Sequence, residues 1–155
     1  MTPAIRVLER AGVAFTLREY RHDPATPAYG LEAAEALGLP PDSVFKTLLA
    51  TLDGKRLAVA LVPVSRTLDL KALARAAGAK KAAMAEAGVA ERATGYVVGG
   101  ISPLGQKQRL ATFIDASAEA LDQLHVSAGR RGLEVSLAPD DLVRLSAARL
   151  AELAR

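Results

Sequence analysis

The segment VFKTLLATL, residues 44–52, is followed by Asp53-Gly54 and then by LAVALV, residues 57–62. Both runs have the length and the apolar content of β-strands. Asp-Gly is a favoured pair in the two-residue turn that joins antiparallel strands. The segment therefore predicts a β-hairpin, and the rest of the fold is interpreted around it.

One side chain of this hairpin does not fit its surroundings. Alternate residues of a strand share a face, so Lys46 shares a face with the apolar residues at positions 44, 48, 50 and 52. An ammonium group is expensive to bury without partners. Lys46 therefore either lies near the strand end and extends to water or faces a pocket, and the pattern alone favours the first.

Outward from the hairpin, helix and strand signals follow one another irregularly. Helices are expected over 3–11, 31–37, 70–77, 84–93 and 118–121 and from Pro139 onward, and strands over 14–20, 96–98, 110–114, 124–127 and 133–137. This order lacks the regular alternation that builds a parallel sheet. The expected fold is α+β, with a mixed, barrel-like β-sheet and surrounding helices. The length, without repeats or a long linker, predicts a single domain over 1–155.

Composition narrows the classes of function. The chain has no cysteine, which excludes disulfides, thiolate metal sites and a cysteine nucleophile. It has no signal-like start and no apolar run of the ~18 residues needed to span a bilayer, so a cytoplasmic protein without membrane contact is expected. The formal charge of +3 and the pI of about 9.4 permit contact with a polyanion without requiring it.

Basic residues form small clusters at Lys80-Lys81, at Lys107 with Arg109, and at Arg130-Arg131. Each cluster taken alone is typical of solvated surface. Stripes of aromatic residues typical of RNA-binding surfaces are missing. If RNA binds, phosphates and a terminal nucleotide are the expected contacts.

A glycine segment, Val98 to Gly105 (VGGISPLG), is the second unusual feature. Two glycines after a predicted strand allow unusual backbone conformations and close approach of a ligand. Amide N–H groups in such a turn can bind an anionic oxygen, although an ordinary tight turn explains the glycines equally well. No Walker loop, metal motif or serine triad is present.

Several other polar residues have ordinary explanations in the sequence. His22 and His125 are the only histidines and are expected to be structural. Tyr20, at a strand end, is interpreted as a packing residue. Glu134 alternates with Leu133 and Val135, which is typical of an outward-facing strand residue.

Three segments together carry a resemblance to a known family: Val44–Leu48, Leu68–Lys71 and Thr94–Lys107. They resemble the YbaK/EbsC family, and within it the branch of YbaK-type Cys-tRNA(Pro) deacylases. The likeness extends from Thr2-Pro3-Ala4 to Arg131-Gly132-Leu133. The family is similar in fold to the editing domain inserted in many bacterial prolyl-tRNA synthetases, which also implies an α+β domain.

The resemblance implies a trans-editing hydrolase. Its substrate would be the ester that joins a wrong amino acid to the 3′ end of tRNA, here cysteine on tRNA(Pro). No metal or other cofactor is implied. The implied partners are the acceptor end of aminoacyl-tRNA and prolyl-tRNA synthetase.

Site residues are implied in the same way. The implied catalytic residues are Lys46, Tyr20, Gly99, Gly100 and Glu134, and the implied substrate-binding residues are Tyr20, Tyr29, Lys46, Thr47, Gly99, Gly100, Ile101 and Ser127. Two of them depart from related sequences: Tyr29 stands where some carry Phe, and Glu134 stands where Asp occurs in the branch. The extra methylene of Glu134 alters the reach of its carboxyl group.

The implied mechanism uses the substrate's own thiol, which attacks the ester carbonyl and releases a cyclic thiolactone. Backbone amides from Gly99 to Ile101 would bind the oxyanion, and Tyr20 and Glu134 would hold the α-amino group and Lys46. Lys46 either anchors the terminal adenosine or acts as a general base, which needs a lowered pKa. Two alternatives are an Ala-tRNA(Pro) deacylase that uses water and a non-catalytic adaptor for tRNA or a synthetase.

Overall fold

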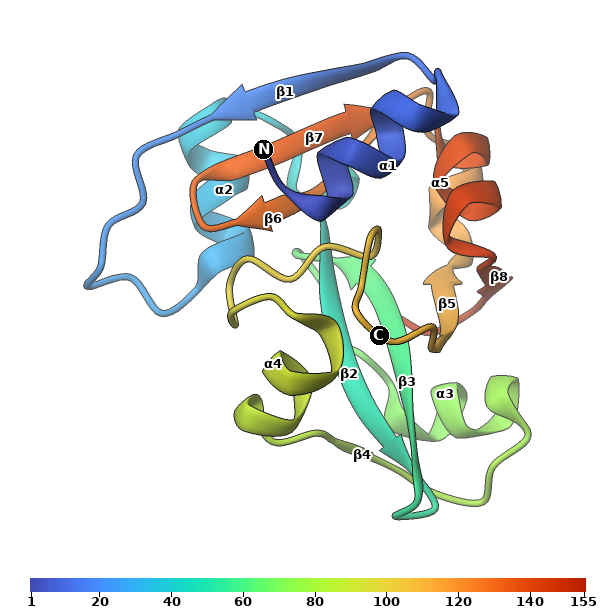
Figure 1. Cartoon of the computed structure of the whole chain (residues 1–155). Helices are drawn as coiled ribbons and strands as arrows, with labels where there is room; N and C mark the ends of the chain where they lie inside the picture. The colour runs from blue at the N-terminus through green and yellow to red at the C-terminus, as the bar shows by residue number, and fades with distance from the viewer.

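The computed structural model describes all 155 residues, which form an α+β domain with two β-sheets (Figure 1). Its helices are α1 (Pro3–Ala11), α2 (Tyr29–Leu37), α3 (Leu70–Ala77), α4 (Ala87–Thr94) and α5 (Pro139–Ser146), with 3-10 helices η1 (Pro41–Ser43) and η2 (Ala116–Ala120). Its strands are β1 (Phe15–Glu19), β2 (Phe45–Leu52), β3 (Arg56–Pro63), β4 (Ala82–Met84), β5 (Ala111–Asp115), β6 (Leu124–Arg130), β7 (Leu133–Leu137) and β8 (Arg149–Ala151).

The predicted hairpin is confirmed as the centre of the larger sheet. Strands β2 and β3 pair antiparallel from Phe45 opposite Pro63 to Leu52 opposite Arg56. The turn between them has positive φ at both central residues, 53° at Asp53 and 65° at Gly54. Positive φ at both positions gives the turn a twist that matches the flanking strands.

The two sheets have different strand orders. The five-stranded sheet has the order β4-β2-β3-β5-β8, with parallel pairs at β3–β5 and β5–β8, and the three-stranded sheet has the antiparallel order β1-β7-β6. A single bridge between Val44 and His125 links them. Neither sheet closes on itself, so the mixed α+β class is confirmed but the barrel-like closure is not.

Hydrophobic residues lie on both faces of the hairpin. One cluster, which includes Phe45 and Leu49, fills the space between the two sheets. The other includes Ala50 and Leu52 and packs against Leu73 of α3. Because both faces of β2 are covered, alternation along this strand does not separate a solvent side from a core side.

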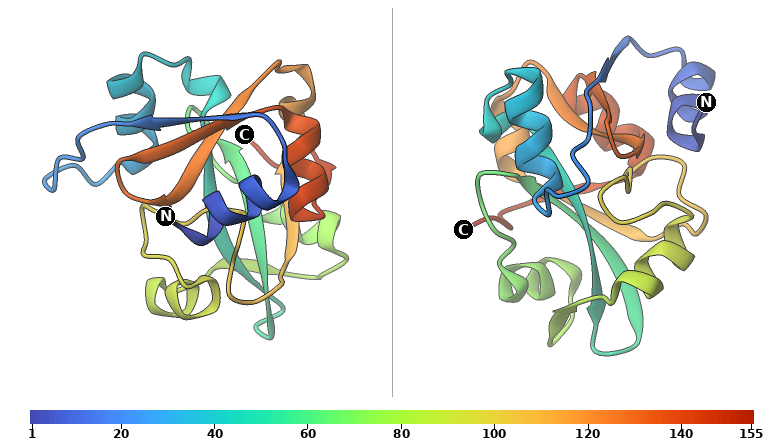
Figure 2. Two further views of the ribbon diagram at one scale, coloured as in Figure 1. Left: turned by 45° about the horizontal axis from the view of Figure 1, so that its top comes forward. Right: turned by 90° about the vertical axis from the view of Figure 1, so that its left-hand side faces the viewer.

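The three-stranded sheet separates two environments. Its inward residues, such as Leu124, Val126 and Val135, belong to the larger core. The opposite face carries polar residues, and Figure 2 shows the sheet lying between α1 on one side and α2 on the other. The cavity described below lies on this polar side.

The structure corrects several predicted elements. Tyr96–Val98 forms no strand, and Met84 belongs to β4 rather than to the following helix, which begins at Ala87. Residues 82–84 pair with the end of β2, and this pairing overrides local helix preference. The segment over 118–121 is a 3-10 helix that begins at Ala116, and β8 was not expected at all.

Candidate functional site

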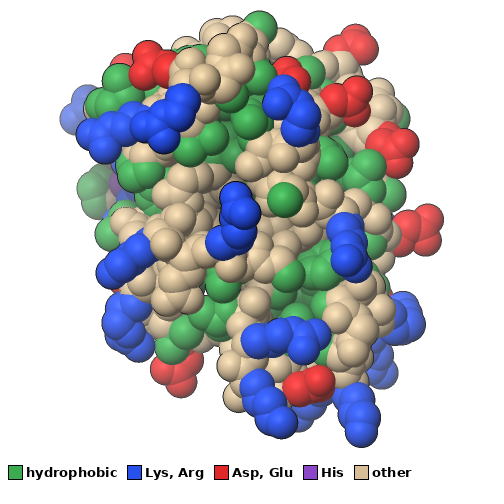
Figure 3. Space-filling model, turned by 45° about the vertical axis from the view of Figure 1, so that its right-hand side comes forward, with side chains coloured by type: hydrophobic (Ala, Val, Ile, Leu, Met, Phe, Trp, Pro, Cys, Tyr) green, Lys and Arg blue, Asp and Glu red, His purple; other side chains and the backbone are tan.

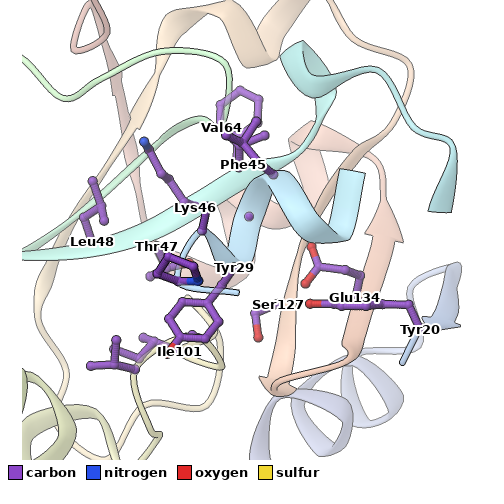
Figure 4. A pocket seen from close by; sticks show the side chains of 16 residues that line it. Tyr20, Tyr29, Phe45, Lys46, Thr47, Leu48, Val64, Ile101, Ser127 and Glu134 are labelled. Atoms are coloured by element: carbon purple, nitrogen blue, oxygen red, sulfur yellow. The ribbon is translucent and has the colours of Figure 1, made fainter. Parts of the chain in front are cut away.

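A cavity of about 290 Å³ lies where the start of β2, the start of α2, the glycine segment and the polar face of the three-stranded sheet meet (Figure 4). Its volume is close to the ~300 Å³ lower bound of known small-ligand pockets. Its lining is mainly apolar with a few polar groups. The lining residues are Tyr20, Pro27, Ala28, Tyr29, Gly30, Leu31, Phe45, Lys46, Thr47, Leu48, Val64, Val98, Gly99, Ile101, Ser127 and Glu134.

Lys46 forms part of the cavity wall near the start of β2. Its side chain is half-buried, and burial lowers the pKa of its ammonium group. It forms no salt bridge, and in Figure 4 its amine extends away from Glu134. The structure therefore does not place Glu134 as a partner that holds Lys46, and the ammonium group is free to bind an anionic or polar group of a ligand.

The glycine segment forms a tight turn at the cavity, not the end of a strand. The N–H of Gly100 donates to the carbonyl of Val97 at 2.8 Å. Gly99 has φ 89°, in the region that favours glycine. A Cβ on Gly100 would lie 2.7 Å from the backbone of Arg130, so the turn packs directly against the β6–β7 connection.

This hydrogen bonding distinguishes the N–H of Gly100 from the N–H groups of its two neighbours. The N–H of Gly100 already has its acceptor, and Gly100 does not line the cavity. The N–H groups of Gly99 and Ile101 have no acceptor within the protein, and both residues line the cavity. Two backbone N–H donors at the cavity are therefore unpaired, whereas Gly100 contributes close packing.

Glu134 is the most unusual ionisable group of the site. Only 6% of the residue is exposed, although alternation predicted an outward-facing side chain. The prediction fails because β7 is the central strand of its sheet, with α2 over the outer face (Figure 2). Burial raises the pKa of Glu134 to about 8, so its carboxyl group is mostly neutral at pH 7.

Tyr20 and Ser127 lie beside this carboxyl group. Figure 4 shows the Tyr20 hydroxyl and the Glu134 carboxyl pointing toward one another. Burial, and then the charge of Glu134, raise the pKa of Tyr20. The Ser127 hydroxyl accepts a hydrogen bond from the N–H of Gly129 at 3.2 Å. The three side chains form a polar group on one side of the cavity.

Tyr29 and Thr47 complete the set of predicted residues. Tyr29 is the first residue of α2, and its ring contacts Gly99: a Cβ there would lie 2.7 Å from the ring. Thr47 Oγ1 is buried and has no hydrogen-bond partner. With the exception of Gly100, every predicted site residue lines one cavity.

The two histidines lie outside this lining. His22 Nδ1 is 2.7 Å from Glu32 Oε1, which ties the loop before α2 to the helix. His125 is buried and shares a hydrogen bond with Ser136. Both have local partners, as expected for structural residues. No group of three side chains suited to hold a metal ion occurs in the protein, and no helix is both long and apolar enough to cross a bilayer.

Sequence reasoning missed some residues of the site. Gly30 lets α2 approach the hairpin, since a Cβ there would lie 2.4 Å from Val64 Cγ1. Arg131 was assigned only to a surface cluster, but it contacts Tyr29 and the glycine turn. Glu91 accepts a hydrogen bond from the N–H of Val98. Gly30, just before the predicted helix, is the only one of these three residues that the sequence could have indicated. The contacts of Arg131 and Glu91 join segments that only the fold brings together.

Comparisons with known proteins identify the family of the chain. A family model described as the aminoacyl-tRNA editing domain matches residues 24–145. The chain is 35% identical over 153 residues to EbsC of Enterococcus faecalis, covering 98% of the chain and 92% of that protein. EbsC is described, provisionally, as a Cys-tRNA(Pro)/Cys-tRNA(Cys) deacylase.

Solved structures share the fold. A crystal structure described provisionally as a trans-editing enzyme for prolyl-tRNA synthetase is 24% identical, with a TM-score of 0.84, covering 100% of this chain and 99% of that one. A crystal structure of a hypothetical protein is 20% identical, with a TM-score of 0.88 and 99% coverage of both chains. At these identities the likeness shows the fold alone.

Proposed function

The chain belongs to the family of aminoacyl-tRNA editing domains, and from that premise we propose that it is a trans-acting deacylase for cysteine attached to tRNA(Pro). One observation carries the proposal. A single cavity combines a free lysine ammonium group, two unpaired backbone N–H donors and a buried carboxyl group, from three segments far apart in the sequence. Related EbsC supports cysteine as the amino acid.

The substrate supplies the nucleophile. The cysteinyl sulfur attacks the ester carbonyl carbon, a C–S bond forms, and the bond from that carbon to the tRNA 3′-oxygen breaks. The thiol proton ends on the 3′-oxygen, so the products are tRNA with a free 3′-hydroxyl and cysteine thiolactone. Water then opens the thiolactone in solution. On this mechanism the protein needs no nucleophile of its own.

The protein's contribution is position and charge. The N–H groups of Gly99 and Ile101 donate to the oxyanion that forms at the carbonyl, and one such donor is worth about 3 kcal/mol in known enzymes. Holding the thiol against the carbonyl adds several kcal/mol. An apolar wall that includes Phe45, Val64 and Ile101 fits a small side chain.

The two ends of the cavity divide the remaining roles. Lys46 points away from Glu134 (Figure 4), so the two groups meet different parts of the substrate. Lys46 anchors the phosphate or ribose of the terminal adenosine. Tyr20 and Glu134 hold the α-amino group, and Thr47 and Ser127 shape the aminoacyl pocket. Anchoring is preferred over a general base because the Lys46 amine extends away from the side of the cavity where Tyr20 and Glu134 hold the aminoacyl group.

Basic side chains provide a second support for tRNA as the partner. On the face shown in Figure 3, Lys and Arg gather toward the lower end, where Figure 1 places the β2–β3 turn and the α3–β4 connection. Lys55, Lys80 and Lys81 of these two segments are exposed. Exposed positive charge of this kind favours contact with phosphates without reading their sequence. Prolyl-tRNA synthetase is the proposed source of tRNA selection.

A substrate panel tests the proposal. Cys-, Ala- and Ser-tRNA(Pro) are incubated with the purified protein, and release of the amino acid is followed over time. Cys-tRNA(Pro) is expected to react at least about tenfold faster than Ser-tRNA(Pro), because serine has the same size but a much weaker nucleophile. Equal rates for the two would contradict attack by the substrate thiol. Preferential release of alanine would point to a water-dependent enzyme, and binding without release to an adaptor.

A further inference from the structure

The β6–β7 connection carries an arginine that contacts the glycine turn on the outside of the cavity. Arg131 Nε donates to the carbonyl of Val98 at 2.8 Å. Its guanidinium group also lies over the ring of Tyr29, 4.9 Å from the ring centre. Arg131 is exposed and does not line the cavity, so its role is not direct contact with a bound aminoacyl group.

The carbonyl that Arg131 binds belongs to the same peptide unit as the N–H of Gly99. A trans peptide is planar, and its C=O and N–H point in opposite directions. Fixing the Val98 carbonyl therefore also fixes the direction of the Gly99 N–H. That N–H is one of the two unpaired donors at the cavity.

Without a contact of this kind the peptide unit would turn easily. Gly99 has φ 89° and no side chain to resist rotation. Val98 is held on its other side as well, since its N–H donates to Glu91 Oε2 at 2.8 Å. Tyr29 links the two residues, because its ring contacts Gly99 and the guanidinium group of Arg131 lies over the same ring.

We propose that Arg131 is a positioning residue, which orients the Gly99 N–H toward the reacting carbonyl through the Val98 carbonyl and the Tyr29 ring. The effect of Arg131 on catalysis rests on the proposed function, whereas its effect on the Gly99 peptide unit does not. A planar guanidinium group suits the role because it donates in a fixed direction while it stacks on an aromatic ring. Lysine can supply charge at this position but not both contacts in one plane.

The test compares Arg131→Met with Arg130→Met. Both changes remove one positive charge from neighbouring exposed residues, but only Arg131 contacts the glycine turn through its side chain, and Arg130 forms no salt bridge. On Cys-tRNA(Pro), Arg131→Met is expected to lower kcat by about ten- to a hundredfold, as for a displaced catalytic group, with KM changed less than about threefold. Arg130→Met is expected to leave kcat unchanged, and Arg131→Lys to recover part of the loss.

A second measurement needs no substrate. In ¹⁵N relaxation experiments on the free protein, the order parameter of the Gly99 amide is expected to fall in Arg131→Met from a rigid value of about 0.85 to below about 0.6. Amides of the β2–β3 hairpin should not change. An unchanged kcat in Arg131→Met, or an equal loss of kcat in Arg130→Met, would overturn the inference.

The two proposals fail in different ways. If the wild-type protein releases no amino acid from any charged tRNA, the proposed function is wrong, and the relaxation experiment still decides whether Arg131 fixes this peptide unit. If the wild type is active and the Gly99 amide stays rigid in Arg131→Met, the proposed function stands and the positioning role is wrong.

Discussion

Replacement of Glu134 by glutamine removes the titratable carboxyl group from the cavity and nearly retains the shape of the side chain. Burial raises the pKa of Glu134 to about 8, against 4.5 for the unperturbed group. The folded state therefore keeps its proton over a pH range in which the unfolded state has lost it. The folded state loses stability relative to the unfolded state as the pH rises from about 4.5 to about 8.

The size of the effect follows from one proton. Each pH unit within that range costs the folded wild type about 1.4 kcal/mol. Between pH 5 and pH 7 the wild type is thus expected to lose up to about 3 kcal/mol through Glu134, whereas the Gln variant does not titrate. Glu134→Gln should match the wild type at pH 5 and exceed its free energy of unfolding at pH 7 by roughly 1–3 kcal/mol.

Urea denaturation of both proteins at pH 5, 6, 7 and 8 measures this difference. Groups other than Glu134 titrate equally in the two proteins, so the difference between the curves isolates this carboxyl group. A difference that does not change with pH would refute the buried, neutral carboxyl group. The variant is also expected to deacylate more slowly, because an amide cannot become a carboxylate that pairs with the α-amino group.

Two further changes test the frame that forms the site. Gly30→Ala should destabilise the protein by about 1–3 kcal/mol, because a Cβ would lie 2.4 Å from Val64 Cγ1, while Gly88→Ala in α4, near only a flexible arginine tip, should be neutral or stabilising in the same denaturation experiment. Asp115→Asn should lower the free energy of unfolding by about 1–3 kcal/mol, because an amide has only one acceptor oxygen whereas both carboxylate oxygens of Asp115 accept hydrogen bonds. Oδ1 accepts from the N–H groups of residues 153 and 154, each at 2.9 Å, and Oδ2 accepts from the N–H of Ser117 at 3.2 Å. An unchanged melting temperature would contradict this role of the two oxygens.

The hairpin shows what could be predicted from the sequence. Its two apolar runs and the Asp53-Gly54 pair are local signals, and the structure places strands and turn where they predict. The caps of α1 are local features of the same kind, with Thr2 accepting the N–H of Ile5 and Gly12 in the left-handed conformation. Such features depend only on neighbouring residues.

Features set by distant segments could not be predicted. Alternation assigned Glu134 to the surface, because nothing near it in sequence shows that α2 covers that face of β7. The closure of the sheets into a barrel was expected and is not seen. The sequence does not show that the N–H of Gly100 is bound by the carbonyl of Val97. The contacts of Arg131 likewise join segments that only the fold brings together.

The position of Lys46 also could not be predicted from the local sequence alone. The strand pattern identified it as unusual and favoured extension to water, and only the resemblance to a known family made it a site residue. The structure places it in the cavity wall, half-buried and without an ion-pair partner. That placement is what the proposed anchoring role requires.

The most direct test is single-turnover deacylation of Cys-tRNA(Pro) by the wild type, Lys46→Ala and Lys71→Ala. Lys71 is exposed in α3 and forms no salt bridge, so it controls for loss of one positive charge. We expect a rate at least about tenfold lower for Lys46→Ala, equivalent to about 1.4 kcal/mol of transition-state stabilisation, and an unchanged rate for Lys71→Ala. A Lys46→Ala variant that folds and deacylates at the wild-type rate would contradict the anchoring role of Lys46.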